Sequence, residues 1–528
     1  MSTRPERNWA EPQLYLANPV VVATMVTTLG CLAWLIAAPH AADLAAQLSR
    51  ASFFRMGASV YTTAWFGGTS LPSYSLTVPW AMATFSPQLL GVFATLCAAL
   101  VGSWLVRKGQ RPRAAAAVLA LSLVGNLVSG RITFAVGVMW ALIALHALTH
   151  ARGRTSTVVA LSAGALATAS SPVAGVLLLL VVAAWILSQP ERTWWNRGTW
   201  LCLATLAPLA ALAVIFPGAG FQPFSIATAL TAFVVSVIVA LIPGSRYVRI
   251  GGALSALAIV GCFVFASAIG SNVARLALLF AAPVLIGSAK VRRSVLVLAL
   301  IPCVAWPTKQ VISDLYSTAD SSSSALYYAE LNTRIGSLQS LASHRIEIVE
   351  PRTHRQAYYL LGHAALARGW NRQLDEASNQ LFYKPGALTD ASYRSWLDSL
   401  AVAYVAVPDA PKDFASTSEA QLVSSQPSFL TPIWQGKHWK LFRVENPAQI
   451  ADGVASVISQ TPVGLVLNVV GPGEAFLRLR WSSGLQIRGV EGCLRPAGQW
   501  TIARFAGGGI ATVAGSWNGL FAQRCKTT

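Results

Sequence analysis

The stretch PVAGVLLLLVVAAWILS at residues 172–188 decides the class of fold to which this chain belongs. It carries no charged side chain, and Arg192 and Arg197 follow it. A helix needs about 20 apolar residues to cross the hydrocarbon core of a bilayer. Runs of this kind recur along the first 306 residues. The sequence therefore predicts a polytopic α-helical membrane domain.

Eleven apolar segments are predicted to form the spans. They are about 20–38, 89–106, 114–129, 132–149, 157–170, 172–188, 199–216, 225–242, 251–269, 276–289 and 294–306. Several are shorter than a full crossing requires, so the pairs that meet at Gly130 and Ser171 could instead be tight hairpins or re-entrant pieces. The first segment could also be a signal peptide, because small residues at 37–42 are typical of a cleavage site.

The composition supports a membrane protein. Of the 528 residues, 54% are apolar and only 11% are charged, whereas soluble proteins carry about 25% charged residues. The mean hydropathy is +0.53. These values exclude a disordered chain, a small disulfide-rich protein and a typical soluble enzyme.

The net charge of +19 reports topology rather than nucleic-acid binding. The first 307 residues hold 19 basic and 4 acidic residues, whereas the remaining 221 hold 20 and 16. The basic residues of the first part gather at the N-terminus (Arg4 and Arg7) and in every second loop, at 107–113, 152–154, 192–197, 246–249 and 290–293. Under the positive-inside rule, these loops and the N-terminus are cytoplasmic, and everything after Trp306 is extracytoplasmic.

The C-terminal part has the pattern of water-soluble protein. Residues 325–343 are predicted to be helical, and short apolar stretches at 346–349, 401–407, 439–444, 463–470 and 476–481 are predicted strands. We expect a membrane domain at 1–307, an α/β domain at 308–450 and a β-rich domain, such as a sandwich, at 451–528.

Two cysteines lie outside the predicted spans. Cys493 and Cys525 fall in the C-terminal part, where an extracytoplasmic compartment permits a disulfide. The sequence alone does not test whether the two residues lie close enough to bond. Spacings typical of zinc sites or of nucleotide-binding loops are absent from the sequence.

Asp43 is the principal candidate for catalysis. It is the only acidic residue in the predicted outer loops of the membrane half. A carboxylate near a bilayer usually has a function or a cationic partner, and it can act as a general base. The alternatives are a helix N-cap or a salt bridge to Arg50 or Arg131. The amphipathic stretch 41–57 could also be an interfacial helix that only anchors the loop.

Two arginines stand alone at the predicted outer ends of spans. Arg131 follows Gly130, and Arg275 follows the residues Ser271-Asn272-Val273-Ala274. Both depart from the positive-inside rule, and a phosphate is a natural partner for a fixed guanidinium. A lipid headgroup, or simple snorkelling of the side chain, is the alternative.

In the C-terminal part, several tryptophans could stack on sugar rings or could belong to the core: Trp370, Trp396, Trp434 and Trp439. Arg372 and Asp375 are three residues apart, so they could pair with each other on a helix or face an active site. His354 and His363 are expected to be surface or core residues rather than ligands.

Several motifs resemble those of an actinobacterial family of multi-pass proteins, over most of the chain up to about residue 445. The matching segments are Asp43-Leu-Ala-Ala-Gln47, Trp65-Phe66-Gly67-Gly68, Tyr74-Ser75, 129–134, 170–175, 272–276, Asn379, Phe382-Tyr383, Tyr393, Trp396-Leu397 and 404–408. The most specific is ARGWNRQLD at 367–375. This family resembles the GT-C class of membrane glycosyltransferases, which implies a GT-C-like fold.

The resemblance implies a polyprenyl-phosphate sugar as donor and an essential acid in the first outer loop, which corresponds to Asp43. With such a donor, we expect its phosphate to meet Arg131 or Arg275, the two lone arginines. Acceptor or loop contacts are expected from five residues: Trp65, Tyr74, Trp370, Arg372 and Asp375. Many GT-C members have a second acid, which the outer face of the membrane half lacks here. We therefore expect no required cofactor, and a divalent metal stays open without a carboxylate pair to hold it.

The predicted function is transfer of a sugar to an envelope glycan or glycolipid at the outer face of the cell membrane. The expected partners are the lipid-linked donor, the acceptor and membrane lipid, and not nucleic acid. A transporter or flippase for a lipid-linked substrate is one alternative. A non-catalytic scaffold for envelope assembly is the other.

Overall fold

The computed structural model describes residues 18–150, 153–189, 196–218 and 220–525. Contacts between residues divide the chain into two compact units. The helical unit consists of segments 1–39, 88–210 and 222–313, and the mixed unit consists of 40–87, 211–221 and 314–528. The basic residues Arg4, Arg7, Arg152 and Arg192 lie outside the described residues.

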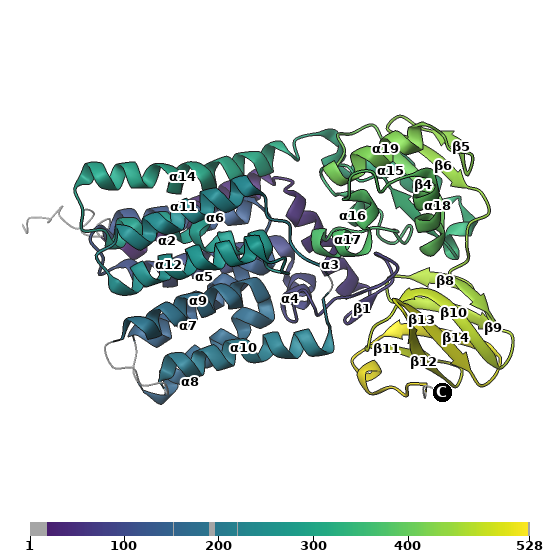
Figure 1. The fold of residues 1–528 in the computed structure, drawn as a ribbon, viewed down its shortest axis with the longest axis horizontal. Helices are drawn as coiled ribbons and strands as arrows, with labels where there is room; N and C mark the ends of the chain where they lie inside the picture. The colour runs from purple at the N-terminus through teal and green to yellow at the C-terminus, as the bar shows by residue number, and fades with distance from the viewer. Residues whose placement is uncertain (1–17, 151–152, 190–195, 219, 526–528) are drawn as a thin grey trace, which may run out of the picture. The chain divides into compact units, whose positions relative to one another are not determined.

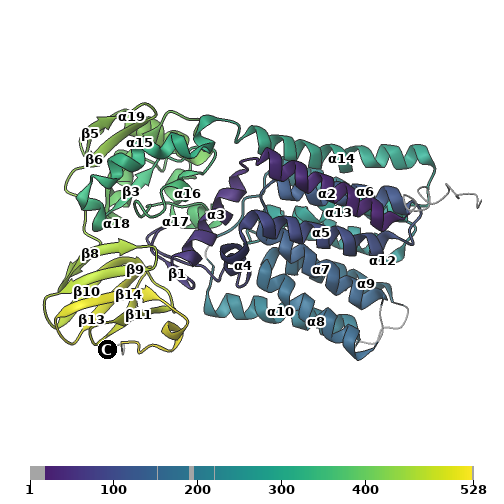
Figure 2. The same ribbon diagram turned by 180° about the vertical axis from the view of Figure 1, so that it is seen from behind.

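Each predicted apolar segment overlaps a helix (Figures 1 and 2). The helices are α2 (Pro19–Ala37), α5 (Pro87–Val106), α6 (Pro112–Val128), α7 (Ile132–His150), α8 (Arg154–Ser170), α9 (Pro172–Ser188), α10 (Arg197–Ile215), α11 (Ile226–Leu241), α12 (Arg246–Val264), α13 (Arg275–Ser288), which follows the 3-10 turn η1 (Gly270–Ala274), and α14 (Arg293–Tyr316).

Within the described residues, seven helices are long and apolar enough to cross a membrane. They are α2, α5, α7, α10, α12, η1 together with α13, and α14; α6, α9 and α11 are shorter apolar helices. The chain is thus a multi-pass membrane protein, and the total of eleven spans stays a prediction.

Small residues let neighbouring helices pack closely in the helical unit. A side chain at Gly137 of α7 would meet the Cβ of Ala174 at 2.6 Å, and one at Gly175 of α9 would meet Oγ1 of Thr168 at 2.1 Å. Ser171 caps α9 by accepting a hydrogen bond from the Ala174 amide, and Pro172 occupies the first turn. Glycine at such positions is typical of helix contacts in membranes.

Basic loops of the helical unit are joined to one another. The amide of Gln110 donates to the carbonyl of Gly287 at 2.7 Å, and that of Gly244 donates to Ser288 at 3.2 Å. These bonds connect the loops at 107–113, 242–246 and 287–293. Arg197 donates to the Ala147 carbonyl at 3.1 Å and connects the segments on either side of α8. Basic loops that the charge pattern places on one membrane face are therefore in contact with each other. That this face is the cytoplasmic one stays a prediction.

The α/β part of the mixed unit contains a four-stranded sheet of order β3-β4-β6-β5 in the fully described range 220–525. Strand β3 (Arg345–Ile348) is parallel to β4 (Val402–Pro408), whereas β6 (Trp439–Val444) and β5 (Leu430–Gln435) add antiparallel pairs. The accompanying helices are η2 (Ser321–Ser323), α15 (Ala325–Gly336), η3 (Gln339–Ala342), α16 (Gln356–Tyr359), α17 (Arg372–Ser378), η4 (Gln380–Phe382), α18 (Asp390–Ser399), η5 (Phe414–Ser416) and α19 (Thr417–Ser424).

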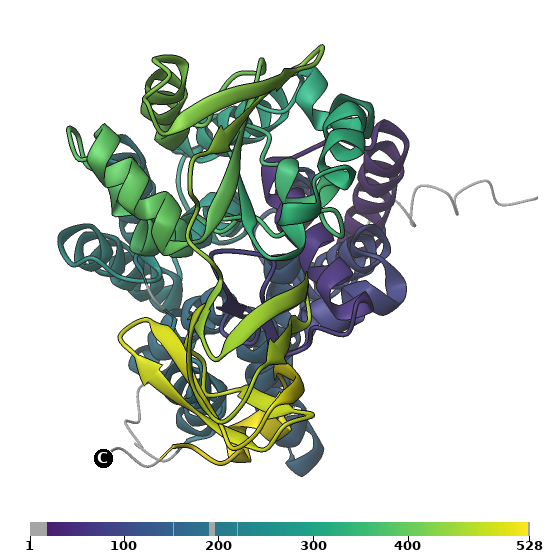
Figure 3. The same ribbon diagram turned by 90° about the vertical axis from the view of Figure 1, so that its right-hand side faces the viewer.

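Residues 451–515 form two antiparallel four-stranded sheets, of order β12-β13-β10-β7 and β11-β14-β9-β8 (Figure 3). Their strands are β7 (Ala451–Gly453), β8 (Ala455–Thr461), β9 (Gly464–Val469), β10 (Gly473–Arg480), β11 (Leu485–Arg488), β12 (Gly492–Ala497), β13 (Trp500–Phe505) and β14 (Gly509–Gly515), followed by η6 (Asn518–Phe521). Leucines such as Leu465 and Leu477 alternate into one buried core between the sheets. Cys493 on β12 is joined to Cys525 by a disulfide.

The first predicted outer loop belongs to the mixed unit. Its elements are α3 (Ala42–Arg55), β1 (Tyr61–Thr62), β2 (Thr69–Ser70) and α4 (Val78–Phe85). Phe53 and Trp65 share a core cluster with Tyr328. The Tyr61 hydroxyl donates to the Arg480 carbonyl at 2.6 Å, and the Leu366 amide donates to the Ala64 carbonyl at 2.8 Å. The loop is therefore a structural part of the C-terminal half.

Candidate functional site

Helix α3 presents Asp43 in its first turn. Ala41 occupies the N-cap position without a side-chain hydrogen bond, so Asp43 lies one position inside the helix and is not the cap. Asp43, Gln47 and Arg50 are spaced four and three residues apart, which places them on one face of the helix. Asp43 is half-buried on this face, whereas Gln47 and Arg50 are buried.

Tyr74 packs against the polar face of α3. The Arg50 guanidinium carbon lies 3.4 Å from the centre of the Tyr74 ring, and Gln47 Nε2 donates to the Tyr74 hydroxyl at 3.1 Å. Burial lowers the pKa of Arg50, and the charge of Asp43 partly offsets this effect. Gln47 and Arg50 thus connect the helix face that carries Asp43 to Tyr74.

Helix α3 is not an interfacial anchor. Arg50 is only 4% exposed, and Leu44, Ala45, Ala51 and Phe53 are also buried. An interfacial helix keeps its charged face in water and its apolar face in lipid, whereas α3 is covered by its own unit. The Ser49 hydroxyl donates to the carbonyl of Ala357 at 2.9 Å.

Trp370 forms a hydrogen bond to the N-terminal turn of α3. Its indole Nε1 donates to the Ala42 carbonyl at 3.0 Å. The His354 ring stacks on Trp370 with centroids 3.4 Å apart, and the Arg372 guanidinium lies 5.1 Å from the indole. Trp370 is half-buried. It therefore connects the turn that carries Asp43 to a charged, aromatic group of residues.

Arg372 pairs with Asp413, not with Asp375. Its Nη1 and Nη2 donate to the two carboxylate oxygens at 2.8 and 2.7 Å, and His354 Nε2 lies 3.2 Å from Asp413 Oδ2. Burial lowers the pKa of His354. Burial acts to raise the pKa of Asp413, but the hydrogen bonds from His354 and Arg372 outweigh it and hold that pKa below its usual range. The Arg372–Asp413 pair therefore stays ionised at neutral pH.

Asp375 belongs to a buried cluster around Arg368. Arg368 is 2% exposed and donates to Asp375 at 2.6 and 2.9 Å. It also donates to Glu350 at 3.0 Å and to Glu419 at 3.3 Å. Of the two alternatives for Arg372 and Asp375, the mutual ion pair does not form, because each side chain has a better placed partner. Asp375 is itself 2% exposed, so this burial does not favour its predicted contact with an acceptor.

The acids of this cluster differ in protonation. Burial, together with the charge of Glu419, raises the pKa of Glu347 well above its usual range, and burial does the same for Glu350. Burial also acts on Asp375, but the Arg368 charge and its hydrogen bonds keep the pKa of Asp375 low. The cluster therefore balances one cation largely by keeping carboxyl groups neutral. Its groups are enclosed, and we interpret the cluster as structural.

Most predicted aromatic contacts lie in the core. Trp65 is 1% exposed, Trp439 is 1% and Trp396 is 8%. Gly369 accommodates Trp65, because a Cβ at this position would meet the indole at 2.3 Å. This contact explains the glycine of the 367–375 motif. Trp434 and Trp370 remain half-buried, and of the five predicted contact residues Trp370, Arg372 and Tyr74 keep exposed surface.

Arg131 and Arg275 lie at one end of the helical unit. Arg131 follows Gly130, whose φ of 74° turns the chain from α6 into α7. The Arg275 guanidinium lies 4.9 Å from the ring of Phe134, which is one turn into α7 from Arg131. Ser129 Oγ is buried beside them and has no hydrogen-bond partner in the described chain. Both arginines and an unsatisfied hydroxyl thus gather where α6 ends and α7 begins.

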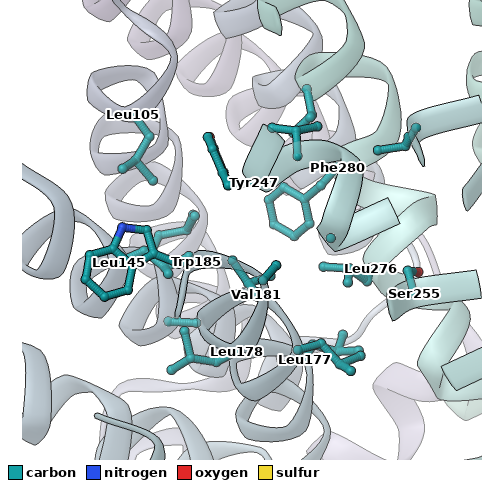
Figure 4. A pocket seen from close by; sticks show the side chains of 18 of the residues that line it. Leu105, Leu145, Leu177, Leu178, Val181, Trp185, Tyr247, Ser255, Leu276 and Phe280 are labelled. Atoms are coloured by element: carbon teal, nitrogen blue, oxygen red, sulfur yellow. The ribbon is translucent and has the colours of Figure 1, made fainter. Parts of the chain in front are cut away.

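A cavity of about 510 Å³ runs through the helical unit (Figure 4). Leu105, Leu145, Leu177, Val181 and Phe280 are among its apolar lining. Leu276, the residue after Arg275, lines one part, and Thr149 and His150 line another. Its lining on α7 extends from Val138 to His150, a length of about 18 Å at 1.5 Å per residue. This shape and chemistry suit an extended hydrocarbon chain.

The structure brings the predicted residues together in two groups. Asp43, Tyr74, Trp370 and Arg372 lie in the mixed unit, and Arg131 and Arg275 lie in the helical unit. The convergence of the two groups on one substrate stays a prediction. Sequence reasoning named Arg50 only as a possible salt-bridge partner of Asp43, missed Asp413, and expected His354 to be a surface or core residue.

No family model and no curated protein matches the sequence. Among solved structures, the chain is similar to the arabinofuranosyltransferase AftD from Mycobacteria. In two structures of AftD the identity is 13% and 14%, the TM-score is 0.42 and 0.37, and the match covers 85% and 87% of this chain. The chain spans less than half of the length of AftD, 42% and 43%.

A second similar structure is the archaeal oligosaccharyltransferase AglB from Archaeoglobus fulgidus in complex with an inhibitory peptide and a dolichol-phosphate. The identity is 10% and the TM-score is 0.40, over 76% of this chain and 70% of AglB. AftD and AglB are both membrane glycosyltransferases of the GT-C type that the sequence resembles. The likeness is coarse and concerns the fold alone.

Proposed function

We propose that the protein is a membrane glycosyltransferase that moves a sugar from a polyprenyl-phosphate donor to an envelope glycan or glycolipid on the outer face of the membrane. The observation that carries the proposal is the face of α3. A half-buried carboxylate, Asp43, is held beside buried Arg50 and Tyr74 on a helix that is itself fixed by Trp370. Such preorganisation is what a general base needs.

In the proposed reaction, Asp43 takes the proton from an acceptor hydroxyl. The acceptor oxygen forms a bond to the anomeric carbon of the donor while the bond between that carbon and the phosphate oxygen breaks. The sugar is transferred with inversion, and the polyprenyl phosphate leaves with the bonding electron pair. Arg131 and Arg275 stabilise the charge that develops on the phosphate.

The helical unit would bind the lipid part of the donor. Leu276, the residue after Arg275, lines the cavity, and the lining is mostly apolar. We place the phosphate on Arg131, Arg275 and the buried Ser129 hydroxyl, and the polyprenyl chain in this cavity. The unsatisfied hydroxyl supports the proposal, because buried polar groups usually have a hydrogen-bond partner.

The acceptor would contact the exposed edge of the Trp370–Arg372 group. The Trp370 indole stacks on His354 and is only half-buried, so it can also contact a sugar ring. Arg372 keeps 16% of its side chain exposed beside it. Neither residue is assigned to catalysis.

The proposal is tested by reconstitution of the full chain in liposomes with polyprenyl-phosphate pentose or hexose as donor and an envelope glycan fraction as acceptor. Transfer predicts that polyprenyl phosphate is released in equal amount to the sugar that appears in the acceptor. Movement of the intact donor across the bilayer without release would identify a flippase. Binding of the glycan with neither release nor movement would identify a scaffold. Both results would contradict the proposal.

A further inference from the structure

Arg355 is a buried arginine whose charge lacks an acidic partner in the described part of the chain. It is 2% exposed, and its Nε and Nη2 are shielded from solvent without a hydrogen-bond acceptor. The ion pairs found among the described residues do not include it. A buried cation without a partner is strongly unfavourable, so such a group needs an explanation.

Other buried arginines of the mixed unit have acceptors. Arg345 is 0% exposed, and although its Nε lacks an acceptor, its Nη1 and Nη2 donate to the carbonyls of Leu400 at 2.7 Å and Arg478 at 2.8 Å. Arg368 is surrounded by carboxyl groups. The fold thus supplies acceptors for buried guanidinium groups elsewhere, and Arg355 differs from both.

The tyrosines around Arg355 do not neutralise it. Tyr328 and Tyr359 interact with its charge, but their hydroxyls donate to the backbone carbonyls of Ser322 at 3.1 Å and Ser323 at 3.3 Å. Burial raises the pKa of Tyr328 above its usual range, so its hydroxyl stays protonated. The environment of Arg355 is therefore aromatic, polar and uncharged.

A second basic residue lies near Arg355 at the start of α3. His40 is an exposed residue that precedes this helix by two residues, and partial burial together with the charge of Arg355 lowers its pKa. The bond from Ser49 to the Ala357 carbonyl fixes α3 against the segment that follows Arg355. Arg355 and His40 are thus two basic groups on the flank of the helix that carries Asp43.

We propose that Arg355 and His40 form a binding site for an oxyanion of the phosphate type. A guanidinium offers parallel N–H donors that match a phosphate, and a buried guanidinium binds it with little competition from water. A lipid-linked phosphate and free phosphate share this chemistry. The existence of the site is independent of the proposed transfer reaction, whereas identification of the anion as part of a lipid-linked substrate rests on it.

The test is thermal unfolding of the full-length protein in detergent, at constant ionic strength, with and without inorganic phosphate, a polyprenyl phosphate or phosphatidylglycerol. A ligand that binds the native state raises Tm. We expect Arg355→Met to unfold at the same or a higher Tm than wild type without ligand, because it removes an unpartnered buried charge. We expect its apparent Kd for the anion to rise roughly 10- to 100-fold, as the loss of a charge-assisted hydrogen bond implies.

Arg345→Met is the matched control. It removes a buried arginine that does have acceptors, so it should lower Tm and leave the anion-dependent increase unchanged. An increase with polyprenyl phosphate but not with phosphatidylglycerol supports a lipid-linked ligand, and an increase with inorganic phosphate as well supports the shared chemistry. The proposal is overturned if no phosphate raises the wild-type Tm. It is also overturned if Arg355→Met lowers the unliganded Tm and keeps the wild-type increase.

Discussion

The Arg368 cluster and the polar face of α3 use the same residue types for different purposes. In the cluster, Arg368 is enclosed by Glu350, Asp375 and Glu419 and is 2% exposed. On α3, Arg50 is covered by Tyr74, and Asp43 keeps access to solvent. The difference teaches that Arg368 and Asp375, two charged residues of the most specific sequence motif (367–375), serve the architecture. The chemistry is expected from the weaker signal around Asp43.

The largest expected effect is on the stability of the cluster. Arg368→Met leaves several buried carboxyl groups without their cation, and breaking a buried ion network costs about 3–5 kcal/mol. Thermal or denaturant unfolding of the purified protein measures this loss. Arg443→Met is the control, because Arg443 is 52% exposed and pairs with Glu445 at the surface, where an ion pair contributes less than about 1 kcal/mol. Equal stability of the two variants would contradict a structural role for the cluster.

Replacement of Arg275 in the helical unit should instead change donor binding and leave thermal stability nearly unchanged. Arg275→Met is expected to raise KM for the donor roughly 10- to 100-fold, because a charge-assisted contact to phosphate is lost. Its Tm should stay close to that of wild type, since Arg275 is half-buried at a helix start. Steady-state kinetics in liposomes measure KM. An unchanged KM together with a lower Tm would place Arg275 with Arg368, as a residue of the fold.

The protonation of the cluster predicts a pH effect of a few degrees in Tm. Burial raises the folded-state pKa of Glu347 above its unfolded value of about 4.3. Its contribution to stability is therefore present below pH of about 4.3 and is lost as pH rises toward the folded pKa. The difference in Tm between Glu347→Gln and wild type should become more positive from pH 5 to pH 8. Glu491→Gln, at an exposed position, should show no such trend, and a flat difference for Glu347→Gln would contradict the assignment.

The smallest effect on stability and rate is expected from loss of the Trp370 hydrogen bond to α3. Trp370→Phe keeps the stacked ring but removes the hydrogen bond to the Ala42 carbonyl, which should cost about 1 kcal/mol. Because this bond holds the turn that carries Asp43, kcat should fall a few-fold with little change in donor KM. Combined unfolding and kinetic measurements test this prediction. A change in donor KM with unchanged kcat would show that Trp370 acts on the donor instead.

The sequence predicted the apolar helices well and the long-range contacts poorly. Apolar runs and alternating basic loops are local patterns, and each predicted segment overlaps a helix. The insertion of residues 40–87 into the mixed unit depends on contacts such as Tyr61 with Arg480, which are about 400 residues apart in the chain. Periodicity carries no information about such partners.

For the candidate site too, local sequence signals identified single residues but not their partners in the fold. The scarcity of acids singled out Asp43, and the positive-inside rule singled out Arg131 and Arg275. Spacing allowed Arg372 and Asp375 either to pair or to face an active site, and the partners in the structure are Asp413 and Arg368. The role of His354 between Trp370 and Asp413 follows from tertiary packing alone.

The most direct test of the central claim is the transfer rate of Asp43→Asn in liposomes, measured beside its Tm. Loss of the general base should lower the rate by roughly 10²- to 10⁴-fold, while Tm stays near that of wild type because Asp43 is half-buried and lies outside the Arg368 cluster. Asp390→Asn is the matched control, an exposed acid in the first turn of α18, and should keep the wild-type rate. Full transfer by Asp43→Asn would contradict the account.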